Sequence, residues 1–486
     1  MSKKIKALAL MLAVAIVLSM VPVNNVQAAT TKQSSLKANE SKKCILSNTY
    51  DKIWFEFTAP ADGFFNVTLS KETPSDSGDF TVKIVDSQGT KEFSSTYGGA
   101  FSTPFYGSKG GQKYYITLEG RKNVYVNVKL NWSNSSCWEN EPNDNQSGAK
   151  PMAANTTYYG VPSSDDNGDY FFVKAPQNGY FVFGIAHNDV TQSGRFEVAV
   201  YESGSSQITE MSTTNGNTIK IGVKAGTLLY VRVRNNYGSS RHQVYKLTPY
   251  FTASETFETE PNNSASQAKT IAFNQTYNGS IGNWSNSDND GDFYKFSVNS
   301  ISQVTINFGP VDIAKTGNWK VVLVNSKGKT ADVLRTDSNK TAKVKLSKGV
   351  YYIRIVNSYN AGNKEYQLKV SAKDLKFKSK RPVIKSASVK KYNGFFNNKK
   401  FVGCSLSKTV AGADGYEVSV ASTKTMKKPF VKDRIKATGK KIKTEKYFKA
   451  SQKSFYVQVK PYFTDPFGTI VYGKKSVVKK TTTKAK

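Results

Sequence analysis

The chain has 486 residues and a net charge of +33, and 38% of its residues are hydrophobic and 12% aromatic. Its only two histidines, His187 and His242, are too far apart for an H-E-x-x-H zinc protease and leave little for a Ser-His-Asp triad. Short alternating apolar runs bounded by Gly, Asn, Asp and Ser dominate, and long apolar stripes of helical period are scarce. We therefore predict an all-β chain of tandem, jelly-roll-like β-sandwiches with several small cores.

The first 28 residues have the pattern of a signal peptide. Three lysines among the first six residues precede an apolar run from Ala7 to Met20, and the small-residue site Val26-Gln27-Ala28 follows. A membrane anchor is the alternative, but Ser19 and Pro22 break the run, and it is short for a membrane span. We expect cleavage near Ala28 and a secreted protein, extracellular or associated with the cell wall, without a transmembrane segment.

Three similar units follow the predicted signal peptide. A strand, a Pro/Gly turn and a second strand at residues 57–65 recur at 173–181, and the third unit keeps the two strands at 293–298 and 304–308. A matching strand lies near the end of each unit. We therefore predict three copies of one sandwich. The predicted boundaries are 29–135, 136–253 and 254–373.

An acidic motif opens the second and third units. Glu139-Asn140-Glu141-Pro142-Asn143-Asp144 returns as Glu258-Thr259-Glu260-Pro261-Asn262-Asn263, and a second acidic group follows at 165–170 and again at 288–293. A polar linker with a strand-ending proline, followed by an ordinary turn, is the alternative reading. Because both acidic groups recur about a domain length apart, the repeat favours a calcium site built from hard oxygen ligands.

These residues carry a family resemblance. The second and third units resemble bacterial pre-peptidase C-terminal domains, β-sandwich modules related to the collagen-binding domains of secreted clostridial collagenases. The shared pattern is Glu-Pro-Asn-Asn/Asp, a small and apolar run, Asp-x-Asp-Tyr/Phe leading into a strand, and a late Gly-x-Tyr-Tyr strand. The resemblance implies calcium as the cofactor. The implied ligands are Glu139, Glu141, Asn143, Asp144, Asp166 and Asp169 in the second unit, and Glu258, Glu260, Asn262, Asn263, Asp290 and Asp292 in the third.

The two implied sites differ from each other, and the first unit differs from both. Asn289 stands where Asp166 does, so we expect weaker calcium binding in the third unit. The first unit has no Glu-Pro-Asn motif and should fold like the others without a calcium site. Cys44 and Cys137 lie at opposite ends of this unit and could form a disulfide or stay apart. Cys404 fits a small buried core residue.

The last segment, 374–486, has a different composition. Between residues 373 and 486, 30 lysines and arginines face six acidic residues, so this stretch supplies +24 of the net charge of +33. It resembles a lysine-rich fibronectin type III domain of secreted Gram-positive proteins. Outside a cell its partners would be teichoic acids, acidic glycans or anionic lipids, and nucleic acid does not fit the export signal. The alternative is a solvated surface that only keeps the protein soluble.

A second candidate surface lies on the late strands. Tyr230 and Arg232 alternate with core-facing valines, and Tyr352 and Arg354 repeat the arrangement. Related collagen-binding modules grip collagen with exposed tyrosines, so these four residues are candidate ligand-binding residues. The alternative is that these residues only form side-chain pairs with their neighbours on the solvent-facing side of the sheet.

The sequence favours binding over catalysis. No P-loop, G-x-S-x-G elbow or G-x-G-x-x-G is present, and we expect His187 and His242 to be exposed loop residues. Paired carboxylates could in principle cleave glycosides, but here they cluster where a metal would hold them. We expect a non-catalytic protein that binds an extracellular polymer such as collagen or a cell-wall polyanion. The alternative is an accessory or targeting subunit of a separately encoded hydrolase.

Overall fold

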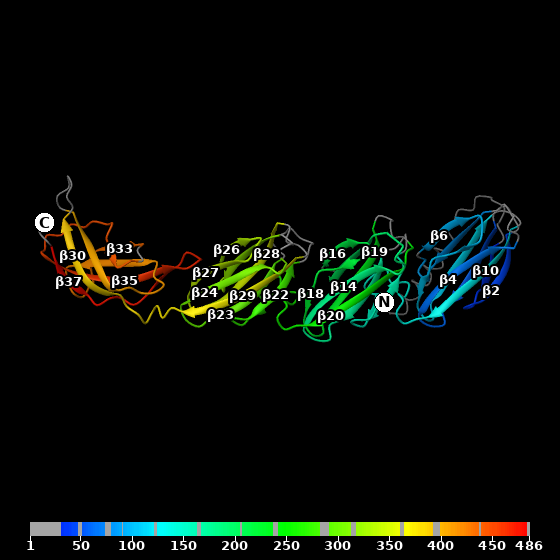
Figure 1. Ribbon diagram of the computed structural model, residues 1–486, viewed down its shortest axis with the longest axis horizontal. Helices are drawn as coiled ribbons and strands as arrows, with labels where there is room; N and C mark the ends of the chain where they lie inside the picture. Colours follow the sequence, from blue (N-terminus) through cyan, green and yellow to red (C-terminus); the bar gives the residue numbers. More distant parts are fainter. Residues whose placement is uncertain are drawn as a thin grey trace, which may run out of the picture.

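The computed structural model of the protein describes residues 31–46, 51–72, 79–89, 91–120, 124–162, 167–204, 207–236, 242–281, 291–312, 317–359, 364–391, 399–436 and 439–483. All regular secondary structure in these residues is β-strand, which confirms the predicted all-β class. The predicted signal peptide at 1–28 lies outside them. Within the described ranges there is no helix that could span a membrane. Four pairs of sheets follow one another in a row (Figure 1).

The first sandwich pairs a sheet of order β1-β3-β9-β5-β6 with a sheet of order β2-β10-β4-β7, in which β8 also pairs with β4. Its strands are β1 (Thr31–Ser35), β2 (Ser41–Leu46), β3 (Asp51–Thr58), β4 (Gly63–Lys71), β5 (Phe80–Val85), β6 (Lys91–Tyr97), β7 (Phe101–Ser102), β8 (Tyr106–Ser108), β9 (Lys113–Gly120) and β10 (Val124–Asn134).

The second sandwich has the same strand order, β11-β13-β19-β15-β16 against β12-β20-β14-β17, with β18 also pairing with β14. Its strands are β11 (Lys150–Met152), β12 (Tyr158–Gly160), β13 (Asp169–Lys174), β14 (Gly179–His187), β15 (Phe196–Glu202), β16 (Gln207–Thr213), β17 (Gly216–Asn217), β18 (Ile221–Val223), β19 (Leu228–Asn235) and β20 (Tyr245–Ala253).

The third sandwich keeps this order with one short strand fewer, β21-β23-β28-β25-β26 against β22-β29-β24-β27. Its strands are β21 (Lys269–Thr270), β22 (Thr276–Ile281), β23 (Asp292–Val298), β24 (Ser302–Pro310), β25 (Asn318–Asn325), β26 (Thr330–Thr336), β27 (Lys340–Leu346), β28 (Gly349–Tyr359) and β29 (Lys364–Asp374). In all three sandwiches the first strand runs parallel to its neighbour, and the other pairings are antiparallel.

The fourth sandwich has a different topology. A three-stranded sheet of order β30-β31-β34 faces a sheet of order β33-β32-β35-β36, in which β37 also pairs with β35. The strands are β30 (Val383–Lys391), β31 (Lys400–Lys408), β32 (Gly415–Ala421), β33 (Pro429–Ile435), β34 (Lys441–Lys443), β35 (Ser454–Thr464), β36 (Ile470–Tyr472) and β37 (Lys479–Thr482).

Alternation along the strands builds each core. On β19, Leu229, Val231 and Val233 are fully buried between the two sheets, while Tyr230 and Arg232 lie on the outer face. Because successive side chains point to opposite faces of a sheet, this pattern fixes which face enters the core. The aromatic and basic face predicted from the sequence is therefore present on the outside of the sheet.

None of the three cysteines forms a disulfide. The Sγ atom of Cys44 lies 3.4 Å from the carbonyl oxygen of Val126 in the first sandwich, whereas Cys137 packs against the core of the second. Of the two possibilities, a disulfide between Cys44 and Cys137 or two separate thiols, the structure shows the second. Cys404 is 5% exposed in the core of the fourth sandwich, as predicted, and burial raises the pKa of its thiol to about 12.

The third and fourth sandwiches share core residues. Phe467, in the turn between β35 and β36, is 5% exposed and belongs to the core cluster of the third sandwich, where its ring stacks on Tyr351 at 6.2 Å. Lys345 and Asp414 form an ion pair across the same junction. The fourth sandwich therefore completes part of the core of the third.

We predict that Phe467→Ala destabilises the third sandwich although the residue belongs to the fourth. Removing a buried phenylalanine ring costs about 3 kcal/mol or more in a core, and here the lost contacts include Tyr351 of β28. Hydrogen exchange in the full chain should accelerate in β28. Val477→Ala is the control, because Val477 is 69% exposed. Unchanged exchange in β28 would contradict the shared core.

Candidate metal centres at the junctions between sandwiches

An aromatic residue immediately precedes each acidic motif and packs on the preceding sandwich. Trp138 stacks on Phe64 of β4 with the ring centroids 4.5 Å apart. Phe257 lies against Tyr180 of β14 with the two rings tilted and their centroids 4.8 Å apart. Each aromatic residue also forms a parallel bridge to its own sandwich, to Tyr159 and to Asn278 respectively. The motif that follows is therefore held between two sandwiches.

The backbone of each motif is hydrogen bonded on both sides. In the first, the Glu139 amide donates to the Tyr159 carbonyl at 2.8 Å, and the Tyr114 hydroxyl of the first sandwich donates to the Glu141 carbonyl at 2.6 Å. In the second, the Glu258 amide donates to Asn278 at 2.8 Å, and the Glu260 amide donates to the Gly222 carbonyl of the second sandwich at 3.0 Å. The two motifs thus share the anchor to the following sandwich and differ in the anchor to the preceding one.

Three carboxylates converge at each junction. One oxygen each from Glu139, Glu141 and Asp169 lies within 4.8 Å of the others, and the same holds for Glu258, Glu260 and Asp292. All six residues are at most 7% exposed. Two oxygens that share one calcium ion lie at most about 5 Å apart, which is twice the ligand distance. Each cluster could therefore hold a metal ion.

A buried tyrosine orients the aspartate of each cluster. The Tyr245 hydroxyl donates to Asp169 Oδ2 at 2.6 Å, and the Tyr366 hydroxyl donates to Asp292 Oδ2. Burial and then the charge of the aspartate raise the pKa of both tyrosines well above the ordinary value, so both stay protonated and donate. Each tyrosine therefore fixes the position of the aspartate in its cluster.

Unpartnered oxygens in the clusters fit a cation. The side-chain oxygen and nitrogen of Asn143 are buried without a hydrogen-bond partner, and so are Glu258 Oε1 and Asn262 Oδ1. A buried polar atom without a partner costs about 1–3 kcal/mol. Buried oxygen atoms of this kind beside a carboxylate triad would be satisfied by a hard cation. The donor set contains no His or Cys, which argues against zinc.

The clusters are electrostatically unfavourable by themselves. Burial, followed by the charges of Glu260 and Asp292, raises the pKa of Glu258 well above its ordinary value. A lysine approaches each cluster, and burial lowers the pKa of both Lys150 and Lys269. Lys150 is committed elsewhere, since its Nζ donates to Asn140 Oδ1 at 2.6 Å and lies 3.5 Å from Asp62 of the first sandwich. A nearby lysine therefore offsets only part of the negative charge.

Several predicted ligands lie apart from the triads or outside the described residues. Asn143 and Asn262 are fully buried beside the carboxylates. Asp144 is only partly buried and Asn263 is exposed, and neither belongs to a triad. Asp166 and Asp290 lie outside the described residues, as does Asn289. The glutamate pair and the last aspartate of each acidic group are thus the residues that the fold brings together.

The first sandwich has apolar residues where the other two carry the site. Ile53 lies six residues before Ala59, as Asp169 lies six residues before Ala175, and Ile53 is buried. Val126 pairs with the last residue of β4, as Tyr245 pairs with the last residue of β14. At these two positions the first sandwich therefore has neither the aspartate carboxylate nor the tyrosine hydroxyl of the site.

Four glycines make room for the motifs. A Cβ atom at Gly160 would overlap Glu139 and Tyr245, and one at Gly279 would overlap Tyr366. In the preceding sandwiches, a Cβ at Gly107 of β8 or Gly222 of β18 would overlap the backbone of Glu139 or Glu258. The sequence reasoning missed these glycines and both tyrosines. The repeat could have revealed them, because each of the two units has a Gly in its edge strand and a Tyr in its last strand.

The predicted ligand-binding residues are engaged within their own sheets. Arg232 contacts Glu197 at 3.0 Å and lies over the ring of Tyr201, and Tyr230 packs on Phe172. Arg354 lies over the ring of Phe293 at 5.6 Å, and Tyr352 is partly buried. These contacts are the solvent-side sheet pairs of the alternative reading, and a ligand role for the four residues stays a prediction.

The expectation for His187 was wrong. His187 is the last residue of β14, is 3% exposed and lies with Nε2 at 2.7 Å from the Gly194 carbonyl oxygen. The reason is that β14 continues through His187, one residue beyond the apolar pattern that ends at Ala186. His242 is partly exposed, and its ring meets Phe93 of the first sandwich edge to face at 5.2 Å. The rings of both histidines therefore contact other residues of the protein.

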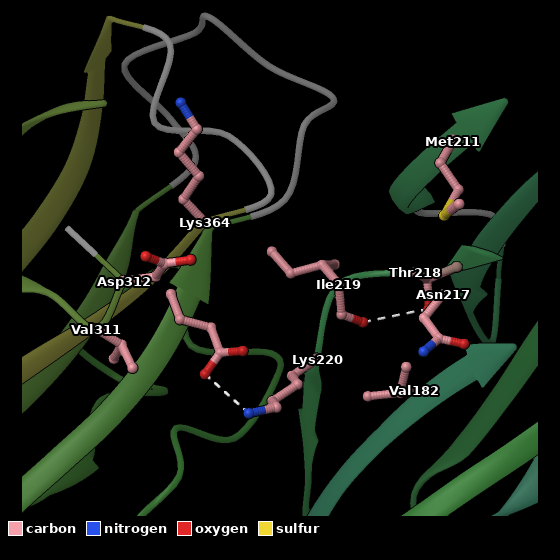
Figure 2. Close-up of a pocket in the computed structure, with 10 residues that line it drawn as sticks. Val182, Met211, Asn217, Thr218, Ile219, Lys220, Val311, Asp312 and Lys364 are labelled. Carbon is pink, nitrogen blue, oxygen red and sulfur yellow. Dashed lines mark hydrogen bonds and ion pairs between the residues drawn. The ribbon is translucent and has the colours of Figure 1, made fainter. Parts of the chain in front are cut away.

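The two junctions differ in polarity. At the first, Val161 and Val244 pack against the core of the first sandwich. At the second, the equivalent positions after Gly279 and before Tyr366 are Ser280 and Glu365, and Glu365 pairs with Lys220 at 2.9 Å. Figure 2 shows the cavity of about 420 Å³ beside this ion pair, lined from both sandwiches. The second junction is therefore more polar than the first at these positions, and it borders a cavity.

Comparisons with known proteins give distant likenesses. No family model matches the chain, and no curated protein matches it. The pre-peptidase C-terminal domain of a collagenase from Bacillus anthracis is 23% identical over 23% of this chain and 100% of that one, with a TM-score of 0.19. A GH2 β-galacturonidase from Eisenbergiella tayi is 8% identical over 64% and 44% of the two chains, with a TM-score of 0.15.

A β-glucuronidase from Ruminococcus gnavus is 9% identical over 38% of this chain and 35% of that one, with a TM-score of 0.13. This chain thus spans less than half the length of each glycosidase. Likenesses at this level say nothing about activity. The fibronectin type III resemblance of the last segment finds no counterpart among these structures.

We predict that Gly222→Ala detaches the second motif from the second sandwich. The new Cβ would overlap the Glu258 carbonyl, which is backbone and cannot move aside, so the Glu260 amide loses its bond to Gly222. Hydrogen exchange at the Glu260 amide should rise tenfold or more, on the order of the loss of one buried hydrogen bond. Gly99→Ala is the control, because nothing lies near its added Cβ. Unaltered exchange at Glu260 would refute the anchor.

Proposed function

We propose that the protein is a secreted, non-catalytic, calcium-binding rod that attaches to extracellular polymers. The observation that carries the proposal is the pair of buried carboxylate triads, Glu139, Glu141, Asp169 and Glu258, Glu260, Asp292, at two successive junctions. Each triad is assembled from a linker and a strand, so an ion bound there would tie the linker to the sandwich that follows.

The choice of calcium rests on the donor set. Calcium takes six to eight oxygen ligands in flexible geometry, whereas magnesium demands octahedral geometry and zinc prefers nitrogen and sulfur. Three carboxylates and an adjacent asparagine, Asn143 or Asn262, supply only oxygen. When bound, calcium would supply the positive charge that offsets the repulsion among the carboxylates. The chain itself supplies the rigid anchors, Trp138 and Phe257, on the preceding sandwich.

The proposed partner is a matrix protein such as collagen or a cell-wall polyanion. The positive charge of the fourth sandwich supports the polyanion. The second candidate function is an accessory or targeting subunit of a separately encoded extracellular hydrolase. The triads support neither catalysis nor a proton donor, because all their carboxylates are buried together at interdomain junctions.

We predict that calcium raises the melting temperature of the full chain and binds with a stoichiometry of two. At 100 times the dissociation constant, one site adds about 2.7 kcal/mol to stability. Asp169→Asn and Asp292→Asn should each remove one equivalent in calorimetric titration. Asp332→Asn is the matched control, since Asp332 is an exposed acid paired with Lys320 in the third sandwich. Two equivalents in both site variants would overturn the assignment.

We predict that attachment to purified cell walls weakens steeply with salt, because lysines bind phosphates by counterion release. Sedimentation of the full chain with walls between 50 and 300 mM NaCl measures this. Collagen pull-down and polysaccharide hydrolysis run in parallel. Salt-resistant binding to collagen would favour the matrix partner, and hydrolysis by the pure chain would contradict the non-catalytic role.

A further inference from the structure

The outer face of the β30-β31-β34 sheet carries a shallow trough of about 360 Å³. Its floor is made of small residues, because Gly403 and Ser405 of the central strand β31 pair with Ser388 and Ser386 of β30. No large side chain stands on this stretch of the central strand. The floor therefore lies close to the backbone and offers serine hydroxyl groups.

Lysines stand along the rim of the trough. Lys441 and Lys443 of β34 pair with Ser405 and Gly403, so both point to the outer face. Their Cα atoms are about 7 Å apart, which is the rise of two residues along a strand. Lys390 lies at the end of the trough on β30. All three are exposed. In the described part of the chain none of them pairs with a carboxylate, and no acidic residue lines the trough.

The lysine-bearing edge is fixed by buried contacts. Thr444, which follows β34, exchanges two hydrogen bonds with Val402 of β31, each 2.9 Å long. Asp433 is 4% exposed and accepts hydrogen bonds from the amides of Glu445 and Lys446 at 2.6 and 2.9 Å. The spacing of the two lysines is therefore set by the fold.

We propose that this trough binds a phosphodiester-linked polyol polymer, with Lys441, Lys443 and Lys390 on the phosphates and the serine floor against the polyol. The proposal rests on the attachment to a polyanion proposed above and names its site. Lysines act as point charges that suit single phosphates, and no arginine rims the trough for bidentate recognition of carboxylates.

The trough does not have the features of a single-stranded nucleic-acid site. Such sites stack successive bases on exposed aromatic rings. Here Phe401 is the one aromatic residue that lines the trough in the described chain, and Lys443 covers its ring at 4.6 Å. A polymer with small hydroxylated repeats fits a floor of serine and glycine better than one with planar bases.

The test uses the full chain and poly(glycerol phosphate), with binding measured by calorimetry at 50 mM NaCl. Lys441→Gln/Lys443→Gln should lose about tenfold or more in affinity. Lys427→Gln/Lys428→Gln removes the same charge from an exposed turn of the same sandwich and should lose about threefold or less. Equal losses in the two variants would overturn the trough while leaving attachment by the whole basic surface intact.

A second variant fills the trough without changing the charge. A Cβ at Gly403 would meet only Ser388 Oγ at 3.7 Å, so Gly403→Leu is tolerated by the backbone and should abolish binding at unchanged melting temperature. Ser419→Leu, on the outer face of β32, is the matched control and should bind like wild type. Wild-type affinity in Gly403→Leu would refute the site.

The ligand class and the proposed function are tested by two further arms. Single-stranded DNA should bind more weakly and should not respond to Gly403→Leu, whereas equal affinity with the same dependence would replace the polyol polymer by nucleic acid. A wild-type chain that binds no anionic polymer at all would overturn the polyanion partner and the trough together. The calcium response of the junctions is unaffected by any of these outcomes.

Discussion

Three carboxylates buried against one another at each of two junctions are the constraint on which this structure depends. Moving a charge out of water costs several kcal/mol per ion, and like charges within 5 Å add to that cost. The fold provides one tyrosine hydroxyl at each site, from Tyr245 or Tyr366, and one nearby lysine, Lys150 or Lys269. These groups compensate for part of the charge. A cation bound in the clusters, as proposed above, would compensate for the rest.

The position of the clusters makes them structural links rather than isolated sites. Each motif is gripped by the preceding sandwich, through an aromatic stack and a glycine that lets the backbones touch, and its glutamates enter the following sandwich beside an aspartate. A single ion at such a point would couple two folded units through a short linker. The first sandwich has no preceding unit among the described residues, and it carries Ile53 and Val126 where the polar groups would stand.

Much of the fold and part of the site follow from the sequence. Period-two alternation predicts the sandwiches because burial of one sheet face forces it, and the duplicated Glu-x-Glu-Pro-Asn motif points to Glu139, Glu141 and Asp169 because a single copy would be an ordinary turn. The tyrosines and glycines were missed since Tyr in a strand and Gly near a turn are common, and only the packing shows what they contact. His187 was misplaced because a strand end depends on tertiary pairing, here with Tyr245.

The junctions also differ in a way that sets how the rod should bend. The first is closed by apolar packing of Val161 and Val244, and the third by Phe467 inserted into the neighbouring core, and such contacts resist opening because apolar surface would be exposed. At the equivalent positions the second has the ion pair of Lys220 and Glu365, whose side chains are 34% and 27% exposed, and a pair of this kind contributes about 0–1 kcal/mol. Phe257 on Tyr180 and the Glu260 amide on the Gly222 carbonyl also hold this junction, next to the triad Glu258, Glu260, Asp292. An ion there would matter most for the angle between the sandwiches.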